Sequence, residues 1–329
     1  MAEVQLLPSI GPLGLVLGIV LTVVSGILIE QLVHYIALRY KRATSGVAAI
    51  FAPLITSSPE LAIFAVAILQ GQFEIAWGSI VAQPFMAATV IYPFIILTTL
   101  GAKLVGRRRY LIPHVHRSVA TPLLVFTLPL LPILALHPEK YGAFGRAYGL
   151  FLLALYVWYA RHMLKEEVES GGVAHLWLRN PVLQTVAAVL AIGVGAEYMV
   201  SGIRELGESL GVDKLALSII LVPLATVIPE SIVGLIFLAK GKDDEGVSAI
   251  VGEKALYSTF YPGLAMALGL YTLEPASILA LTLAVVVSII EVVIVWRYGY
   301  FGLSAPVGLL SYVYYVDCFV FGAVCPQIF

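Results

Sequence analysis

Two short stretches inside long apolar runs carry the residue types best suited to chemistry. Residues 56–60 read TSSPE and residues 226–230 read TVIPE, each near the middle of its run. Proline inside a helix removes a backbone donor and clashes with the carbonyl four residues earlier, which frees the carbonyls of Ile55 and Ala225. Hard cations such as Ca²⁺ bind carbonyl, hydroxyl and carboxylate oxygens, usually six to eight of them. The two stretches therefore predict an oxygen-rich cation site.

The two glutamates beside the prolines distinguish a cation site from a helix kink with a purely structural role. A proline kink in a membrane helix often only bends it, and hydroxyl groups often satisfy the freed carbonyls. A carboxylate at mid-bilayer costs at least about 2.5 kcal/mol, so two of them beside the kinks favour function over structure. Glu60 and Glu230 are the predicted metal ligands. The full set of candidate ion-binding residues is Glu60, Glu230, Thr56, Ser57, Thr226, Gln83, Glu253 and Lys254, with Glu30 and Glu197 as secondary candidates.

Composition indicates that lipid surrounds the elements carrying these residues. Of the 329 residues, 60% are hydrophobic and only 12% are charged, whereas soluble domains carry about 25% charge. The apolar runs are about 20 residues long, which is the length of a membrane-spanning helix rather than of a barrel strand. No removable signal peptide is expected. Cys318 and Cys325 predict neither a metal site nor a disulfide framework.

The chain is predicted to be an all-α polytopic membrane protein with ten transmembrane helices, broken at mid-membrane where the prolines fall. The predicted spans are Leu13–Ala37, Gly46–Leu69, Ile75–Leu100, Val119–Leu136, Arg146–Leu164, Pro181–Val200, Leu215–Ala239, Val247–Leu270, Ala276–Trp296 and Leu303–Val324.

Lysine and arginine are distributed unequally between the two sides of this arrangement. The loops after the odd-numbered spans hold 14: Arg39, Lys41, Arg42, Lys103, Arg107, Arg108, Arg109, Arg117, Arg161, Lys165, Arg179, Lys240, Lys242 and Arg297. The other side holds four, namely Lys140, Arg146, Arg204 and Lys214. Cytoplasmic loops are enriched in these residues, so both termini are predicted to face away from the cytoplasm, most simply in the cell membrane.

An internal repeat divides the chain. Residues 53–82 and 223–252 share Pro, Thr, Pro-Glu and Gly at a constant separation of 170 positions. Five predicted spans separate the copies, and an odd number gives them opposite orientations, as in many secondary transporters. We therefore expect two inverted five-helix repeats, residues 1–165 and 166–329, whose repeated segments are 46–100 and 215–270.

This pattern resembles the cation/calcium exchanger superfamily, which includes sodium/calcium and calcium/proton antiporters. Its two inverted repeats each carry Thr-Ser-x-Pro-Glu, followed about 20 residues later by Gly-Asn-x-x-Gly-Ser-Asn. Residues 56–60 match the first motif, and residues 226–230 match its second copy with Val227 in place of serine. The resemblance covers about 140 residues and implies a secondary-active cation antiporter that works by alternating access.

The second family motif is largely missing. Residues 78–84 keep only its first glycine and residues 248–254 only its second, and the serine positions hold Gln83 and Glu253. The family's Asn or Asp ligands fall on Ala87 and Tyr257. The resemblance therefore leaves the transported ion open, and Ca²⁺, Na⁺ and H⁺ all remain candidates.

Lys254 is unusual because a lysine deep within a span is expensive unless it is paired. One interpretation is that it snorkels to the interface. The other is that it pairs with Glu60, Glu230 or Glu253, where its ammonium would stand in for a coupling cation.

Other functions fit less well. We find no zinc-hydrolase, serine-hydrolase or aspartyl-dyad pattern, so the chain is not expected to be an enzyme. A channel or a non-transporting receptor on the exchanger fold remains the alternative. The expected partners are the lipid bilayer and small inorganic cations, with no nucleic acid and no cofactor, and a monomer is plausible.

Overall fold

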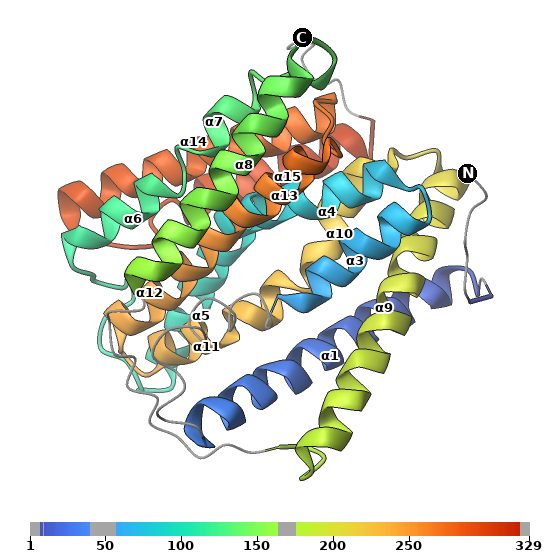
Figure 1. Cartoon of the computed structure of the whole chain (residues 1–329). Coiled ribbons are helices and arrows are strands. Elements are labelled where there is room, and N and C mark those ends of the chain that lie inside the picture. The colour runs from blue at the N-terminus through green and yellow to red at the C-terminus, as the bar shows by residue number, and fades with distance from the viewer. Residues whose placement is uncertain (1–6, 9, 40–56, 164–175, 323–329) are drawn as a thin grey trace.

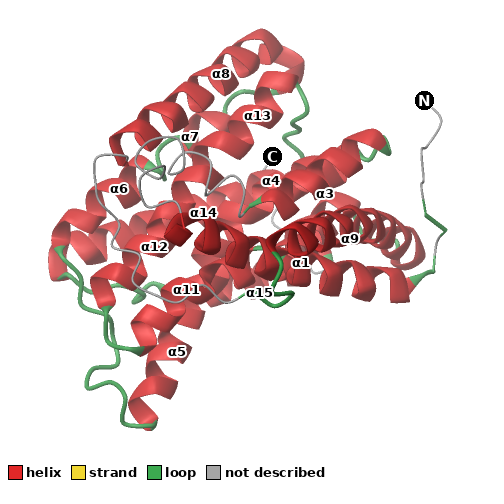
Figure 2. Cartoon of the chain, turned by 60° about the horizontal axis from the view of Figure 1, so that its bottom comes forward, coloured by secondary structure: helices red, strands yellow, loops and turns green. Residues whose placement is uncertain are grey.

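A computed structural model describes residues 7, 8, 10–39, 57–163 and 176–322 of the chain. Within these residues the regular structure is helical, apart from one isolated bridge between His114 and Tyr300, and Figure 2 shows the helices as one bundle. The helices are α1 (Pro12–Arg39), α3 (Ser58–Leu69), α4 (Phe73–Met86), the π-helix η2 (Ala87–Ile91), α5 (Tyr92–Leu104), the 3₁₀-helix η3 (Arg117–Val119), α6 (Ala120–Val125), α7 (Leu130–Ile133), α8 (Pro138–Met163), α9 (Pro181–Leu210), α10 (Lys214–Ala225), α11 (Val227–Ala239), α12 (Asp243–Ala255), the π-helix η4 (Leu256–Phe260), α13 (Tyr261–Leu268), α14 (Pro275–Tyr298) and α15 (Ala305–Phe319).

The outer surface of the bundle is apolar. Long aliphatic side chains stand exposed on several helices, among them Leu104 at 78%, Leu13 at 74% and Val182 at 71%. Water would disfavour so large an apolar surface, whereas lipid tails do not. The chain is therefore an integral, multi-pass membrane protein.

Within the described residues, five helical segments are long and apolar enough to cross a membrane, or six if the bent pair α10–α11 forms one span. The predicted ranges 46–69, 119–136, 247–270 and 303–324 contain helices that do not meet the same criteria. The count of ten spans therefore stays a prediction. Cys318 is disulfide-bonded, which corrects the expectation that the two cysteines form no disulfide.

Helices α1 and α9 cross closely along one side of the bundle (Figure 1). A Cβ added at Gly18 of α1 would lie 2.6 Å from the backbone nitrogen of Met199, and one added at Gly202 of α9 would lie 2.7 Å from the Cβ of Leu15. Small residues let the backbones of membrane helices approach in this way, where van der Waals packing rather than hydrophobicity drives association.

Helices α4 and α10 make the second close contact, deep in the bundle. A Cβ on Gly78 of α4 would lie 1.6 Å from the Ser218 hydroxyl of α10, so only glycine fits there. This contact holds the C-terminal part of α4 beside the end of α10, and so positions Gln83 against Thr226.

Two segments repeat the same local structure. In each, a helix ends at a glycine with positive φ, Gly71 at 70° and Gly241 at 76°, and a second helix then runs into a five-residue π-helix. The hydrogen bonds that close the two helix ends also match. The Gln72 N–H donates to the Ala67 carbonyl at 2.8 Å, and the Lys242 N–H donates to the Phe237 carbonyl at 3.0 Å. The sequence repeat is thus also a repeat of backbone structure.

A basic loop is tied to the second of these segments. Arg108 is 8% exposed and donates to both carboxylate oxygens of Asp243, at 2.5 and 2.8 Å. It also donates to the Leu238 carbonyl at 2.6 Å. The guanidinium therefore joins the loop after α5 to the end of α11 and the start of α12.

Candidate ion-binding site

The break between α10 and α11 falls at Thr226, as the sequence predicted. Thr226 has φ −118° and ψ −60°, and the axes of the two helices differ by 44°. Pro223 lies inside α10, and its ring removes one backbone donor. The Thr226 hydroxyl donates back to the Val222 carbonyl at 3.3 Å. The break therefore places a hydroxyl and an acid-bearing helix start in the protein interior.

Glu230, in the first turn of α11, is held by hydroxyl groups from two other elements. The Ser57 hydroxyl, at the start of α3, donates to Oε1 at 2.6 Å. The Tyr257 hydroxyl, in η4, donates to Oε2. Tyr261 donates to the Ser57 carbonyl at 2.8 Å and so braces the same arrangement. One carboxylate thus links residues of both sequence repeats.

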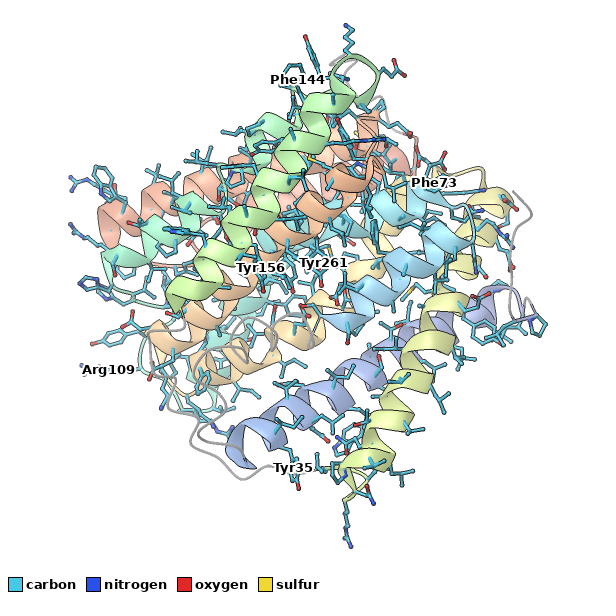
Figure 3. All side chains as sticks on the ribbon, viewed as in Figure 1. Tyr35, Phe73, Arg109, Phe144, Tyr156 and Tyr261 are labelled. Atoms are coloured by element: carbon cyan, nitrogen blue, oxygen red, sulfur yellow. The ribbon has the colours of Figure 1, made fainter. Side chains whose placement is uncertain are left out.

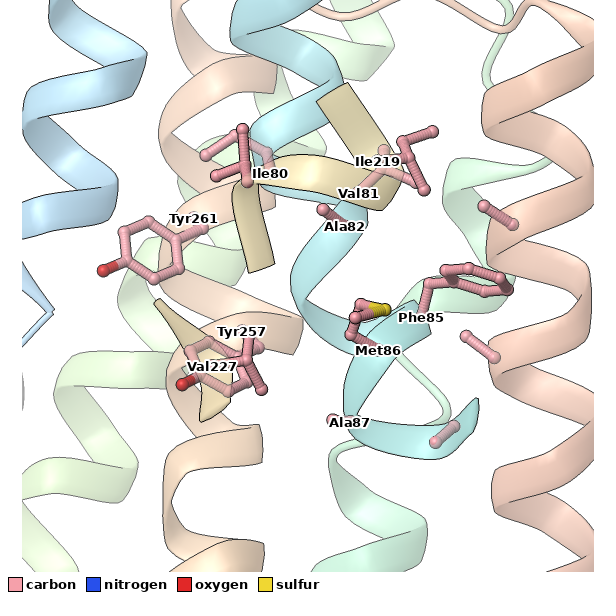
Figure 4. Packing of buried hydrophobic residues seen from close by; sticks show 14 of the residues in the cluster. Ile80, Val81, Ala82, Phe85, Met86, Ala87, Ile219, Val227, Tyr257 and Tyr261 are labelled. Carbon is pink, nitrogen blue, oxygen red and sulfur yellow. The ribbon is translucent and has the colours of Figure 1, made fainter. Parts of the chain in front are cut away.

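Tyr257 and Tyr261 stack one above the other, with ring centroids 6.2 Å apart and planes inclined by 16°. Their hydroxyl groups point the same way, away from the α4 side chains Ile80 to Ala87 (Figure 4). Tyr261 lies in the interior of the bundle, near Tyr156 (Figure 3). π-Helical segments often mark functional sites, and η4 is the segment that aims Tyr257 at Glu230.

Glu60 is in a different state. It lies in the first turn of α3 and is 1% exposed, yet neither carboxylate oxygen has a hydrogen-bond partner among the described residues. The Thr226 hydroxyl is close enough to interact with it, and the Tyr261 phenol interacts with both Glu60 and Glu230. Both acids therefore lie near Tyr261, and their joint role in binding one ion stays a prediction.

A buried carboxylate with no partner calls for a cation or a proton. Removing an ion from water without compensation costs several kcal/mol even after the protein relaxes. The positive end of the α3 dipole offsets only part of this cost, typically about 0.3–1 kcal/mol. Glu60 therefore has the burial and the free lone pairs of a cation ligand.

Gln83 adds an amide close to Thr226. It is fully buried in α4, its Nε2 donates to the Thr226 hydroxyl at 3.3 Å, and its Oε1 has no partner. Among the described residues, Glu60 thus offers two unpaired oxygens near the break and Gln83 offers one. Carboxylate, amide and hydroxyl oxygens are the donor set that a hard cation accepts.

Lys254 has other described partners than the predicted acids Glu60 and Glu230, and the side chain of the third predicted partner, Glu253, lies outside the described residues. Its ammonium donates to the Ser288 hydroxyl of α14, and the acid with which it interacts is Glu291. It does not join Glu60 or Glu230. The sequence places Lys254 within the repeat, but the acid that it meets depends on how α12 packs. In the structure α12 packs so that the Lys254 ammonium reaches α14.

The other predicted residues divide into two groups. Thr56 and the Glu253 side chain lie outside the described residues. Glu30 lies on α1 next to Ile29, which packs near Ala188 of α9, and Glu197 is 4% exposed on α9. Their role as cavity-lining acids stays a prediction.

Sequence reasoning missed the part played by Tyr257, which it treated only as a lost ligand. The sequence signal was that Tyr257 stands where the family has an Asn or Asp ligand, because a phenol at that position can donate a hydrogen bond that a carboxylate would accept. Ser288 and Glu291 were also missed. A glutamate within one apolar run and a lysine within another are complementary charges that could have been paired.

Comparison with known families identifies the class of protein. The family model described as sodium/calcium exchanger protein matches residues 10–165 and 181–323. The chain therefore belongs to the sodium/calcium exchanger family, and the resemblance predicted from its motifs is confirmed. No curated protein sequence matches the chain significantly.

Solved structures support the same fold. The structure of native YfkE is 16% identical, with 92% of this chain and 89% of that chain aligned at a TM-score of 0.65. The H⁺/Ca²⁺ exchanger CAX is 17% identical, with 92% of this chain and 80% of that chain aligned at a TM-score of 0.67. The sodium–calcium exchanger NCX_Mj is 16% identical, with 92% of this chain and 97% of that chain aligned at a TM-score of 0.55.

Proposed function

We propose that this protein is a secondary-active antiporter that moves Ca²⁺ or another metal cation across a membrane in exchange for protons or Na⁺. Membership of the exchanger family supports transport of a cation. The single observation that carries the site is Glu60, which is 1% exposed and whose carboxylate oxygens have no hydrogen-bond partner in the described part of the chain. A cation would bind there between α3, α4 and the α10–α11 break.

Coupling follows from competition for one carboxylate. A metal cation at Glu60 would use its two oxygens, the free amide oxygen of Gln83 and the Thr226 hydroxyl. Without the metal, a proton on Glu60 would remove the cost of a buried charge. Because only one of the two can occupy Glu60, the site would carry either cargo but not both. Alternating access would then expose the loaded site first to one side and then to the other.

The ligand set favours protons as the counter-ion. The positions at which the family has Asn or Asp ligands hold Ala87 and Tyr257, and Tyr257 donates to Glu230 rather than offering oxygens to an ion. A full set for Ca²⁺ and several Na⁺ ions would need more acceptors. We therefore expect weak or absent Na⁺-driven Ca²⁺ exchange.

Flux in proteoliposomes tests the proposal. Purified protein is reconstituted, and Ca²⁺ or Mn²⁺ uptake is followed by an internal dye under a pH gradient, a Na⁺ gradient or neither. Uptake should saturate, depend on the pH gradient and disappear in Glu60→Gln. The control Glu139→Gln, an exposed acid in the first turn of α8, should keep wild-type rates. Uptake without any counter-gradient would identify a channel instead. Cation binding without flux would identify a receptor.

The membrane arrangement is part of the same proposal. We propose ten spans in two inverted halves, residues 1–165 and 166–329, in the cell membrane, with both termini outside the cytoplasm. The bias of Lys and Arg to one side supports this orientation. Cleavage of the loop at Arg107–Arg109 by trypsin should occur in inside-out vesicles and not in intact cells. The opposite result would reverse the orientation.

A further inference from the structure

A second group of buried polar side chains lies apart from Glu60 and Glu230. We call it the Lys254 cluster, and it consists of Lys254 from α12, Ser288 and Glu291 from α14, and Tyr92 from α5. Lys254 is 2% exposed and Glu291 is fully buried. The exchange cycle proposed above uses none of these residues. Their charges therefore need a separate explanation.

Glu291 accepts hydrogen bonds from two backbone donors. Its Oε1 accepts the N–H of Gly302 at 2.5 Å and its Oε2 accepts the N–H of Ser304 at 3.0 Å. Both donors belong to the turn that leads into α15, where the helix dipole also favours negative charge. Two N–H groups leave lone pairs on both oxygens unused. The carboxylate is thus fixed in position and still able to bind a cation.

The cluster holds more oxygens than its donors use. The Tyr92 hydroxyl is buried without a hydrogen-bond partner, although it lies close enough to Ser288 and Glu291 to interact with both. The Ser304 hydroxyl is also buried, and it lies close enough to Glu291 to interact with it. The described charge that balances them is the ammonium of Lys254, which donates to Ser288 and interacts with Glu291.

We propose that the Lys254 cluster is a monovalent-cation site whose resident cation is the lysine ammonium. Glu291, Ser288, Tyr92 and Ser304 supply the oxygens. A small cation of similar charge, Na⁺ or methylammonium, binds there once the ammonium is removed. The tethered ammonium cannot leave, so this site does not exchange its cation during transport.

The test measures cation binding rather than transport. All variants carry Glu60→Gln, so that the first site cannot contribute. Thermal unfolding of purified protein is measured in NaCl or methylammonium chloride against choline chloride at equal ionic strength. With Lys254→Ala added, the melting temperature should rise by about 5 °C between 1 and 300 mM Na⁺ or methylammonium. The parent with Lys254 intact should not respond.

Adding Glu291→Gln to Lys254→Ala should abolish the response, because it removes the anionic oxygen. A folded Lys254→Ala variant with no response to either cation would overturn the proposal. If Lys254→Ala cannot be purified, recovery of folded protein on adding Glu291→Gln supports it, whereas failure of both variants overturns it. The result does not depend on whether the wild-type protein transports cations.

Discussion

Replacing Tyr257 with phenylalanine tests whether its hydroxyl holds Glu230 away from a bound cation. The change removes the bond to Oε2 and leaves the ring, which is 1% exposed and stacked on Tyr261. A hydrogen bond to a charged group contributes about 1.5–3 kcal/mol. Released from this bond, Glu230 can direct Oε2 to the cation. The dissociation constant for Ca²⁺ or Mn²⁺ should therefore fall by about tenfold, the factor that corresponds to the lower value.

The same substitution should lower the stability of the cation-free protein by about 1–3 kcal/mol, because a buried acceptor loses a partner. Isothermal titration in detergent gives the dissociation constant, and thermal unfolding without metal gives the stability. Tyr261→Phe is the matched control, since it removes a hydroxyl that donates to the Ser57 carbonyl rather than to an acid. Equal cation affinity in Tyr257→Phe and wild type, with a change in Tyr261→Phe instead, would refute this reasoning.

Three further substitutions test the elements around the site. Thr226→Val removes the acceptor of the Gln83 amide and should weaken cation binding several-fold in the same titration, while a fold-only role would leave it unchanged. Gly18→Ala forces the α1–α9 crossing apart and should cost about 1–3 kcal/mol in thermal unfolding, whereas Gly193→Ala, which meets nothing within 4 Å, should cost far less. Arg108→Gln removes the charged partner of Asp243, which still accepts the His114 N–H, and should cost about 1.5–3 kcal/mol by the same measurement; a loss below about 1 kcal/mol would show that the pair is not structural.

Much of the architecture follows from the sequence because it depends on local physics. Apolar runs of the length of a bilayer predict helices, and each predicted range contains helix in the described residues. The helix break at Thr226 follows from proline chemistry, since the ring removes a backbone donor wherever it lies. That Glu60 and Glu230 act together at one site stays a prediction from the sequence repeat.

The contacts that the sequence did not reveal depend on tertiary packing. Tyr257 becomes a donor to Glu230 only because η4 lies beside the start of α11. Lys254 meets Ser288 because α14, more than 30 positions away, packs within reach of α12. The count of spans is also uncertain from sequence alone, because helices such as α3 and α15 are short and their membrane depth depends on their neighbours.

The two π-helical segments reveal a shift in register between the repeats. Glu60 and Glu230 are 170 positions apart, but η2 and η4 begin at Ala87 and Leu256, which are 169 apart. One residue has therefore been lost or gained between the acid and the π-helix in one copy. Beyond this point the side chains of the two halves no longer correspond, and Tyr257 matches Ala88 in structure rather than Ala87. Under alternating access, two equivalent halves would give inward-facing and outward-facing states of equal free energy. This single-residue difference adds to the sequence differences between the two copies, so under the proposed mechanism we expect the empty protein to rest predominantly in one of the two states.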